Sequence, residues 1–405
     1  MSEFMHTVPT PQHVPAGRVV DFDIYNPDIE NGEYQLAYRK LYEPNIPDLF
    51  WTPHNGGHWV VTRSALMRQL LTDTQHFSSR SILVPKEGNA NPPLKPIQSD
   101  PPDHAKYRAL ISRTLSPKTI LPMDADVREL TIRLIEGFKA AGECEFITGF
   151  AYHLPIAIFM KLVSLPAEDS ERLREIVCAA SFAVDPQGRN ENLARLYAYS
   201  MQKVRERRAN PGPDLISSIV AAEIDGQKID DDSANGMIVL LLLAGLDTVA
   251  SMLGFFAYFL ARNPAHRQQL RADPSIIPAA VEEMLRRFPI AILGREVAEN
   301  VELDGVELHA GDQIVVPTML GGLDDRRFEA AEDVDFKRKN PIHATFGVGA
   351  HRCMGAMLAR MELKIFLEEW LQRIPDFQVK PGARMTVHTG IVGTITSLPL
   401  VWETH

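Results

Sequence analysis

The sequence predicts a mainly helical fold with a minor, segregated β part, which places it in the α+β class. Helical patterns dominate residues 100–291 and return over 354–374, whereas strand chemistry appears around 45–62, over 295–320 and near the C-terminus. The chain has 405 residues, of which 45% are apolar, and it shows no linker, repeat or low-complexity run. We therefore expect a single domain, residues 1–405, around one large core.

The N-terminal quarter is expected to hold short elements. Two apolar runs flank Asn55-Gly56, which predicts a β-hairpin. A short helix is expected from Ser64 to Leu71. Residues 83–99 are rich in Pro, Asn and Lys and indicate a long surface loop. Asp100-Pro101-Pro102 then predicts a helix start, with Asp100 as the capping residue and prolines at the first positions.

The helical bulk is expected to be interrupted twice, at Asp185-Pro186-Gln187-Gly188 and at Asn210-Pro211-Gly212. From Val301 to Val316 the pattern changes to strands, with Asp304-Gly305 as a tight turn. A loop-rich meander over 321–345 precedes the last helix and the C-terminal strands.

Composition excludes several classes of function. A net charge of −10 and a pI near 5.7 disfavour nucleic acid as a partner. Cys144, Cys178 and Cys353 lie far apart and show neither CxxC spacing nor an even disulfide set, which favours a reducing compartment. The N-terminal stretch is polar and lacks an apolar signal core. We expect a cytoplasmic protein.

The segment Met237 to Ala261 is almost wholly apolar and long enough to cross a bilayer. Its middle carries Gly245, Asp247 and Thr248, and an unpaired carboxylate at mid-bilayer is costly. The alternative is a central helix buried on all sides, which also reads as apolar all round. We favour the buried helix and expect no membrane association.

Residues 346–355 read Phe-Gly-Val-Gly-Ala-His-Arg-Cys-Met-Gly. An apolar stripe at helical spacing follows (Met354, Met357, Leu358, Met361, Ile365, Trp370), so Cys353 should lie near a helix N-terminus, where N–H groups and the helix dipole lower the pKa of a thiol. Phe346 can pack over the sulfur and exclude water. Such a thiolate suits an iron ligand; the alternative is a half-buried structural cysteine on a tight turn.

The pattern Phe-Gly-x-Gly-x-His-x-Cys-x-Gly resembles the haem-binding signature of the cytochrome P-450 monooxygenases. The likeness covers nearly the whole chain and is closest to the bacterial camphor hydroxylase branch, in segments such as Gly245 to Val249 and Arg373 to Phe377. The resemblance implies the cytochrome P-450 fold, with haem b between a long central helix and the loop that bears Cys353. Cys353 would ligate the iron, and Phe346 and Gly347 would contact the haem from the same loop.

Haem carries two anionic propionates, which call for Arg or His donors. His104 and Arg108 are four residues apart on one helix face, His351 precedes the cysteine by two residues, and Arg295 follows Gly294. Taken singly, each is an ordinary solvated charge. Their positions match the propionate ligands that the resemblance implies.

Glu283-Met284-Leu285-Arg286 places an acid and a base at i, i+3, where they can pair. An ordinary surface ion pair is the alternative. The resemblance implies a structural brace that holds the meander behind the haem loop. The usual third partner is a meander arginine; none directly precedes Phe336, and Arg327 is the candidate here.

Ala244 to Thr248 resembles the oxygen-activation segment of the family. The resemblance assigns catalytic roles to Asp247, as a proton relay from solvent, and to Thr248, as a hydrogen-bond donor that positions water. Gly245 weakens the helix where a local opening would admit O₂ and water. A buried Asp-Thr pair at an internal kink is the structural alternative.

By the same resemblance, an apolar cavity lies over the haem, so the substrate should be compact and hydrocarbon-like. Pro92 stands where the camphor enzyme has a tyrosine that orients the ketone, and Leu83 replaces an aromatic residue. We therefore expect a terpenoid or norisoprenoid, such as an ionone, rather than camphor. The residues expected to line the cavity are Leu83, Leu94, Leu240, Leu243, Ala244, Ala291, Leu293, Ile391 and Val392.

The chain carries no fused flavin or iron–sulfur segment, so the resemblance implies a separate [2Fe–2S] ferredoxin fed by an NAD(P)H-dependent reductase. Docking candidates are Arg108, Arg360 and the run Lys337-Arg338-Lys339, and a monomer is expected. Two other functions stay open: a haem-thiolate enzyme that uses peroxide directly, and a haem-binding sensor or carrier without turnover. Asp247 and Thr248 argue against both.

Overall fold

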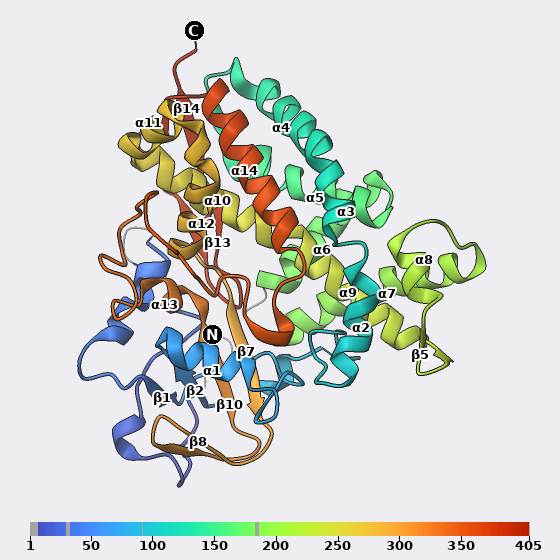
Figure 1. Cartoon of the computed structure of the whole chain (residues 1–405), viewed down its shortest axis with the longest axis vertical. Helices are drawn as coiled ribbons and strands as arrows, with labels where there is room; N and C mark the ends of the chain where they lie inside the picture. The colour runs from blue at the N-terminus through green and yellow to red at the C-terminus, as the bar shows by residue number, and fades with distance from the viewer. Residues whose placement is uncertain (1–6, 30–32, 91, 183–185, 405) are drawn as a thin grey trace.

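The computed structural model describes residues 7–29, 33–90, 92–182 and 186–404. Helices fill one side of the molecule and a mixed sheet lies on the other, near the N-terminal segments (Figure 1). The predicted class, mainly α with a segregated β part, is confirmed.

The main sheet has the strand order β1-β2-β10-β7-β3. The Asn55-Gly56 hairpin is confirmed: β1 (Leu49–Thr52) and β2 (His58–Val61) pair antiparallel. β2 runs parallel to β10 and the other pairs are antiparallel, which joins the N-terminal hairpin to strands about 250 residues later. The remaining strands of this sheet are β3 (Phe77–Ser78), β7 (Ile292–Val297) and β10 (Gln313–Pro317).

The C-terminal strands form smaller sheets, and Asp304-Gly305 makes the predicted turn between β8 and β9. A three-stranded sheet has the order β11-β14-β4, and three hairpins complete the β part. These strands are β4 (Glu143–Glu145), β5 (Glu223–Ile224), β6 (Gln227–Lys228), β8 (Val301–Leu303), β9 (Val306–Leu308), β11 (Phe377–Val379), β12 (Thr386–His388), β13 (Thr394–Ser397) and β14 (Pro399–Trp402).

The helices agree with the predicted helical regions. The short helix after the hairpin is α1 (Ser64–Thr72), and the helix behind the cysteine loop is α14 (Ala356–Arg373). The others are α2 (Asp103–Ser112), α3 (Pro117–Ile120), α4 (Asp124–Lys139), α5 (His153–Val163), α6 (Ser170–Phe182), α7 (Pro186–Ala209), α8 (Leu215–Val220), α9 (Asp231–Leu246), α10 (Thr248–Arg262), α11 (Pro264–Ala272), α12 (Ile277–Arg287) and α13 (Thr318–Leu323), with a π-helical turn, η5 (Ile147–Ala151), before α5.

The apolar central segment is the core of the helical side. Asp231–Arg262 is long and apolar enough to span a membrane, but 67% of its most apolar window lies buried inside the protein. It is also not one continuous helix, because Asp247 leaves helical geometry between α9 and α10. The predicted opening therefore lies at Asp247 rather than at Gly245. Gly245 instead permits close packing, since a Cβ there would lie 2.3 Å from a ring carbon of Phe159 in α5.

Two local predictions are wrong. Residues 83–99 lack long elements, as expected, but they do not form a surface loop, because Leu83, Val84 and Leu94 are buried. Asp100 does not cap α2, which begins at Asp103; its carboxylate accepts hydrogen bonds from the Ser78 hydroxyl (2.5 Å) and the Ser79 N–H (2.7 Å) instead. Tertiary partners outcompeted the local cap. The predicted interruption near Asp185-Pro186-Gln187-Gly188 agrees with the end of α6 at Phe182 and the start of α7 at Pro186, although Pro186 to Gly188 form the first turn of α7; Asp185 lies outside the described residues.

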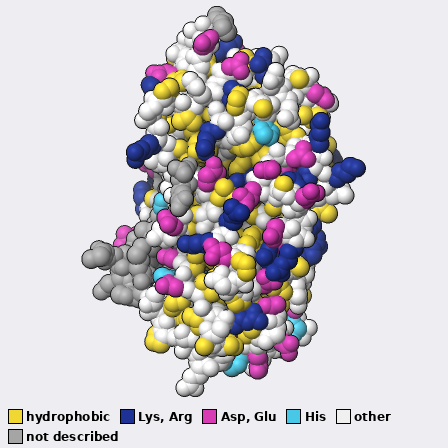
Figure 2. All heavy atoms as spheres, turned by 90° about the vertical axis from the view of Figure 1, so that its left-hand side faces the viewer, with side chains coloured by type: hydrophobic (Ala, Val, Ile, Leu, Met, Phe, Trp, Pro, Cys, Tyr) yellow, Lys and Arg dark blue, Asp and Glu magenta, His cyan; other side chains and the backbone are white. Residues whose placement is uncertain are grey.

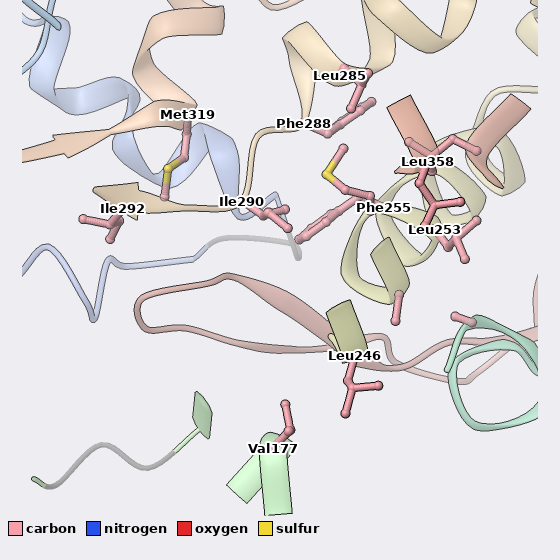
Figure 3. Close-up of a cluster of buried hydrophobic side chains, with 14 of the residues drawn as sticks. Val177, Leu246, Leu253, Phe255, Leu285, Phe288, Ile290, Ile292, Met319 and Leu358 are labelled. Atoms are coloured by element: carbon pink, nitrogen blue, oxygen red, sulfur yellow. The ribbon is translucent and has the colours of Figure 1, made fainter. Parts of the chain in front are cut away.

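Two buried clusters hold the helical side together. Phe146, Phe150, Phe366 and Trp370 pack with ring centroids 5.1–5.6 Å apart, which joins η5 to α14. A second cluster gathers side chains from α6, α9, α10, α12, β7, α13 and α14 (Figure 3). On the face shown in Figure 2, basic and acidic side chains are interspersed, and no area of one sign dominates.

Candidate functional site

The loop that carries Cys353 is built by glycines in left-handed geometry. Gly347 and Gly349 have φ of 66° and 73°, and a Cβ on Gly349 would lie 2.7 Å from the carbonyl oxygen of Leu71 at the end of α1. The Cys353 N–H donates to the Phe346 carbonyl (2.8 Å), which folds the loop back on itself. The sulfur therefore lies just before α14 and accepts the N–H groups of Gly355 and Ala356.

The environment of Cys353 differs from the prediction. Burial raises the pKa of its thiol, although the N–H of Gly355 and the Arg108 guanidinium oppose the shift. The predicted lowering is wrong for the polypeptide alone, because lost hydration outweighs the donors. Protein atoms lie close enough to Cys353 to remove water from around the thiol, yet part of the residue's surface remains exposed. Cys353 is therefore accessible from outside the polypeptide.

The stripe behind Cys353 is mostly as predicted. Leu358, Ile365 and Trp370 are buried, and α14 ends at Arg373, before Pro375. Met357, however, is an exposed apolar side chain in the first turn of α14, so it does not belong to the core face. Phe346 packs against the core and carries the Arg360 guanidinium 4.6 Å above its ring.

Four donors predicted from distant parts of the sequence come together. The rings of His104 and His351 lie 4.1 Å apart, and the charges of Arg108 and Arg295 act on both imidazoles. Arg108 donates to the Arg352 carbonyl (2.6 Å) and Arg295 to the Gly294 carbonyl (2.6 Å). In the described part of the chain no carboxylate forms a salt bridge with either arginine.

Burial dominates the protonation of this cluster. It lowers the pKa of His351 to about 3, with Arg295 adding to the effect, and that of Arg295 to about 10. His351 Nε2 lies 3.0 Å from the Ser79 hydroxyl, whereas the buried His104 Nε2 has no hydrogen-bond partner among the described residues. A buried guanidinium and an unsatisfied imidazole nitrogen are costly unless an anionic ligand meets them.

The predicted oxygen-activation segment forms the break in the central helix. The Thr248 hydroxyl donates to the Ala244 carbonyl (3.0 Å), and Ser251 donates its N–H and its hydroxyl to the Asp247 carbonyl (both 3.0 Å). The Asp247 side chain is 2% exposed, and among the described residues neither carboxylate oxygen has a partner. Burial raises the pKa of Asp247 to about 6.

The residues predicted to line a cavity fall into two walls. The first wall is on α9, where Leu240 and Leu243 are half-buried and Ala244 is exposed although the helix is central. Leu94 lies beside this helix, because the neighbouring Pro93 carbonyl oxygen would be 2.5 Å from a Cβ on Gly236 of α9.

The second wall centres on β7. Ala291 bridges to Val392, the Ile292 N–H donates to the Ile391 carbonyl (2.9 Å), and the Gly294 N–H donates to the Ile82 carbonyl, next to Leu83. Leu293 lies 3.9 Å from the Cβ position of Gly347, which brings this wall to the cysteine loop.

The Glu283–Arg286 pair is a buried ion pair rather than a surface one. The two side chains are 1% and 0% exposed and share two hydrogen bonds of 2.8 and 2.7 Å. Arg286 also donates to the carbonyls of Ala331 and Asp333 in the meander (both 2.7 Å). The pair thus ties α12 to the meander.

The third partner of this pair is Arg338, which sequence reasoning missed. Arg338 Nε donates to Glu283 Oε1 (3.0 Å), and its other nitrogens reach the carbonyls of Glu329 and Ala330. Arg327 instead lies exposed over the Phe328 ring. The arginine was visible in the Lys-Arg-Lys run, but it follows Phe336 instead of preceding it.

The same contacts involve two arginines of the predicted docking patch. Arg338 pairs with Glu283, and Arg360 donates two hydrogen bonds to the Glu282 carboxylate. Burial alone would raise the pKa of Glu282, but the contacts with His343 and Arg360 hold it at about 2. Both arginines therefore already have a carboxylate partner within the protein. Lys337 and Lys339 are exposed, and so is Arg352 beside the cysteine.

These residues fit a haem. An exposed cysteine, donors without an anionic partner among the described residues, and apolar walls match the iron ligand, the two propionates and the ring of that cofactor. The unsatisfied His104 nitrogen and the buried Arg295 charge are what a bound dicarboxylate would satisfy.

Comparisons with known proteins agree with this arrangement. The sequence model of the family described as Cytochrome P450 matches residues 188–389. "Probable cytochrome P450 127A1" of Sinorhizobium fredii is 32% identical over 98% of this chain and 97% of its own length. Two crystal structures, of CYP101J2 and CYP101C1, are each 38% identical, with TM-scores of 0.89 and 0.88, and cover 98% of this chain and 100% of theirs.

Proposed function

This chain belongs to the cytochrome P450 family and is a monooxygenase, and we propose that it hydroxylates an unactivated C–H bond of a small terpenoid or norisoprenoid, such as an ionone. The observation that carries the proposal is the apolar character of both walls, from Leu240, Leu243 and Ala244 on α9 to Leu293 beside β7. We infer that both walls face one space, opposite Cys353. We further propose that the protein acts as a cytoplasmic monomer.

Haem b, bound through Cys353, would supply the activation of O₂. The polypeptide would hold it at several points. The N–H groups of Gly355 and Ala356 stabilise negative charge on the sulfur, and Phe346 of the same loop would keep water from it.

On the haem edge, Arg108 and Arg295 would bind the carboxylates as charged donors, and His104 and His351 as neutral ones.

On the opposite side, two side chains would manage protons. With a pKa of about 6, Asp247 can both hold and release a proton near neutral pH, which suits a relay group. The Thr248 hydroxyl, now bonded to the Ala244 carbonyl, lies at the same break and would position water. This pair argues against direct use of peroxide and against a carrier without turnover.

The loop that carries Pro92 supports a substrate oriented by shape. A tyrosine does reach this loop: Tyr197 of α7 donates its hydroxyl to the Pro92 carbonyl (2.5 Å). Because that hydroxyl is already used, it does not offer a donor to a ketone. We therefore propose that camphor is a poor ligand and that surface burial sets the affinity.

Electrons would come from NAD(P)H through a reductase and a [2Fe–2S] ferredoxin that docks beside Cys353. Arg108, Arg352, Lys337 and Lys339 are the basic residues near that face that remain free of carboxylate partners among the described residues. We leave Arg360 and Arg338 out of the proposed patch because each already pairs with a carboxylate.

Two measurements test the function. The reduced protein with carbon monoxide should give the absorption band of a haem thiolate, and Cys353→Ser should lose it. Titration with β-ionone should then convert the haem from low to high spin, and product analysis should find one added oxygen atom. A full spin shift with camphor, together with tight coupled turnover, would overturn the substrate assignment.

A further inference from the structure

The segment 80–98 buries two leucines of the proposed walls with very little regular structure. In its described part, the three-residue turn η3 (Lys86–Gly88) is the only helix or strand. Leu83 and Leu94 are nevertheless 6% and 5% exposed. Buried backbone groups need hydrogen-bond partners, and here neither a helix nor a sheet supplies them. Side-chain amides supply several of them instead.

The Asn89 side chain closes the first half of this segment on itself. Its Oδ1 accepts the N–H groups of Ile82 (2.8 Å) and Leu83 (3.2 Å). Its Nδ2 donates to the carbonyls of Leu83 (3.2 Å) and Lys86 (2.9 Å), and to the Ser81 hydroxyl (2.9 Å). Both the acceptor and the donor end of the amide are therefore used, and Leu83 is bound at its N–H and at its carbonyl.

The loop closed by Asn89 is also attached to the main sheet. Gln313 of β10, which is 6% exposed, donates its Nε2 to the Leu83 carbonyl (2.7 Å) and to the Ser81 hydroxyl (2.9 Å). The Gly294 N–H of β7 donates to the Ile82 carbonyl (3.1 Å), and a Cβ on Gly294 would lie 2.5 Å from that oxygen. The backbone of Leu83 is thus held beside β7, at the second wall.

Leu83 depends on these hydrogen bonds more than Leu94 does. The N–H of Leu94 is likewise bound by a side-chain amide, that of Gln98 (2.9 Å), but Leu94 also belongs to the main hydrophobic cluster. Among the described residues Leu83 does not belong to that cluster. Its Cδ1 lies 3.8 Å from the Cβ position of Gly88, which is part of the same loop. Core packing therefore does not explain where Leu83 lies.

We propose that Asn89 is a specificity-determining positioning residue, whose amide holds Leu83 in the wall of the substrate space. This inference rests on the proposed function, which places Leu83 in that wall. Without the amide, the N–H of the buried Leu83 would lose its partner, and an unpaired buried donor is costly. The loop would then turn this N–H toward water and displace the leucine. Asn89 acts on the substrate only through Leu83.

The first test needs no turnover. The haem of the holoenzyme is titrated with 4-phenylimidazole, whose ring extends from the iron into the space above it, and with imidazole as the small control. Asn89→Ala should weaken 4-phenylimidazole by about fivefold, roughly the worth of one hydrogen bond, and imidazole by less than about twofold.

The same titration in a Leu83→Ala background shows whether Asn89 acts through Leu83. There, Asn89→Ala should weaken 4-phenylimidazole by less than about twofold, because the effects of residues that act through each other are not additive. Equal weakening in both backgrounds would overturn the proposal. This outcome does not depend on whether β-ionone is the substrate.

The second test measures where the substrate is hydroxylated, with β-ionone as the probe. Asn89→Ala should change the ratio of the hydroxylated products by about fivefold, whereas loss of folded enzyme alone would lower the amounts and not the ratio. Asn210→Ala, at an exposed asparagine just after α7, is the control and should leave the ratio unchanged.

Asn89→Asp separates the two ends of the amide with almost no change in shape. Oδ1 remains an acceptor, but the donors are lost and a carboxylate oxygen faces the carbonyls of Leu83 and Lys86. This variant should change the product ratio as Asn89→Ala does. An unchanged ratio in both Asn89 variants would overturn the proposal. If the unmodified enzyme gives no product, the substrate assignment fails, and the ligand titrations still decide the role of Asn89.

Discussion

Glu362 of α14 is a buried acid that forms no ion pair with a described residue. It is 1% exposed, its Oε1 has no hydrogen-bond partner among the described residues, and burial raises its pKa to about 8. Such a group is stable in the interior only while it is protonated. It therefore couples folding to pH.

The sign of that coupling can be predicted. Because the pKa of Glu362 is higher in the folded state, the folded protein binds more protons between about pH 4.5 and pH 8, so stability falls as pH rises through this window. Glu362→Gln should reduce the decrease in the free energy of unfolding over this window by up to about 5 kcal/mol. Denaturant unfolding at pH 5 and pH 8 measures it, with exposed Glu129→Gln as control. Parallel pH profiles for Glu362→Gln and the unmodified protein would contradict the prediction.

Arg295 is the opposite case, a buried cation that forms no ion pair with a described residue. Arg295→Met should let the apoprotein unfold at an equal or higher temperature, because a desolvated charge is removed. The same change should speed haem transfer to apomyoglobin by about tenfold or more, since a charge-assisted hydrogen bond is worth about 1.5–3 kcal/mol. Arg133→Met, on the surface of α4, is the control. Unchanged haem loss would remove Arg295 from the propionate site.

At the scale of elements, close backbone contacts fix how helices pack. A Cβ on Gly322 in α13 would lie 1.8 Å from the carbonyl oxygen of Arg286 in α12, whereas a Cβ on Gly137 in α4 would meet nothing within 4 Å. Gly322→Ala should therefore destabilise the fold by about 3 kcal/mol, and Gly137→Ala should stabilise it by up to about 1 kcal/mol. Guanidinium unfolding measures both, and equal effects would refute the packing argument.

The meander depends on the Glu283–Arg286–Arg338 cluster. Arg338→Ala leaves Glu283 partly unpaired in a buried site and should cost about 3 kcal/mol, the lower end for a broken buried pair because Arg338 keeps some exposure. Lys337→Ala, one residue earlier and exposed, should change stability by less than about 0.5 kcal/mol. A loss at Lys337 that matches the loss at Arg338 would show that the run acts as surface charge.

For docking of an electron donor, the distribution of charge over the molecule matters more than its net charge. The net charge is −10, yet exposed Arg352 lies beside Cys353. Arg352→Glu should slow reduction by the proposed ferredoxin partner about tenfold at low ionic strength and much less at high salt, since screening removes long-range attraction. Arg133→Glu is the control. A slowing that does not depend on salt would argue against electrostatic docking at this face.

Much of the architecture followed from local pattern. Asn55-Gly56 specified its hairpin because turn geometry is local, and the apolar stripe of α14 located Cys353 at a helix start. The errors have a common cause. Asp100 accepts hydrogen bonds from Ser78 and Ser79 instead of capping α2. The polar segment at 83–99 buries Leu83, Val84 and Leu94. Both outcomes depend on contacts with residues distant in the sequence.

The sequence by itself determined the family, the cysteine loop and the residue types around it, because each depends on a short pattern. Only the tertiary structure decided protonation and partnership. Burial in the folded protein raises the pKa of Cys353, and Arg338 rather than Arg327 pairs with Glu283. The buried Asp247 carboxylate has no donor among the described residues. Desolvation and long-range pairing depend on what the rest of the chain packs around a group, and no local pattern records that.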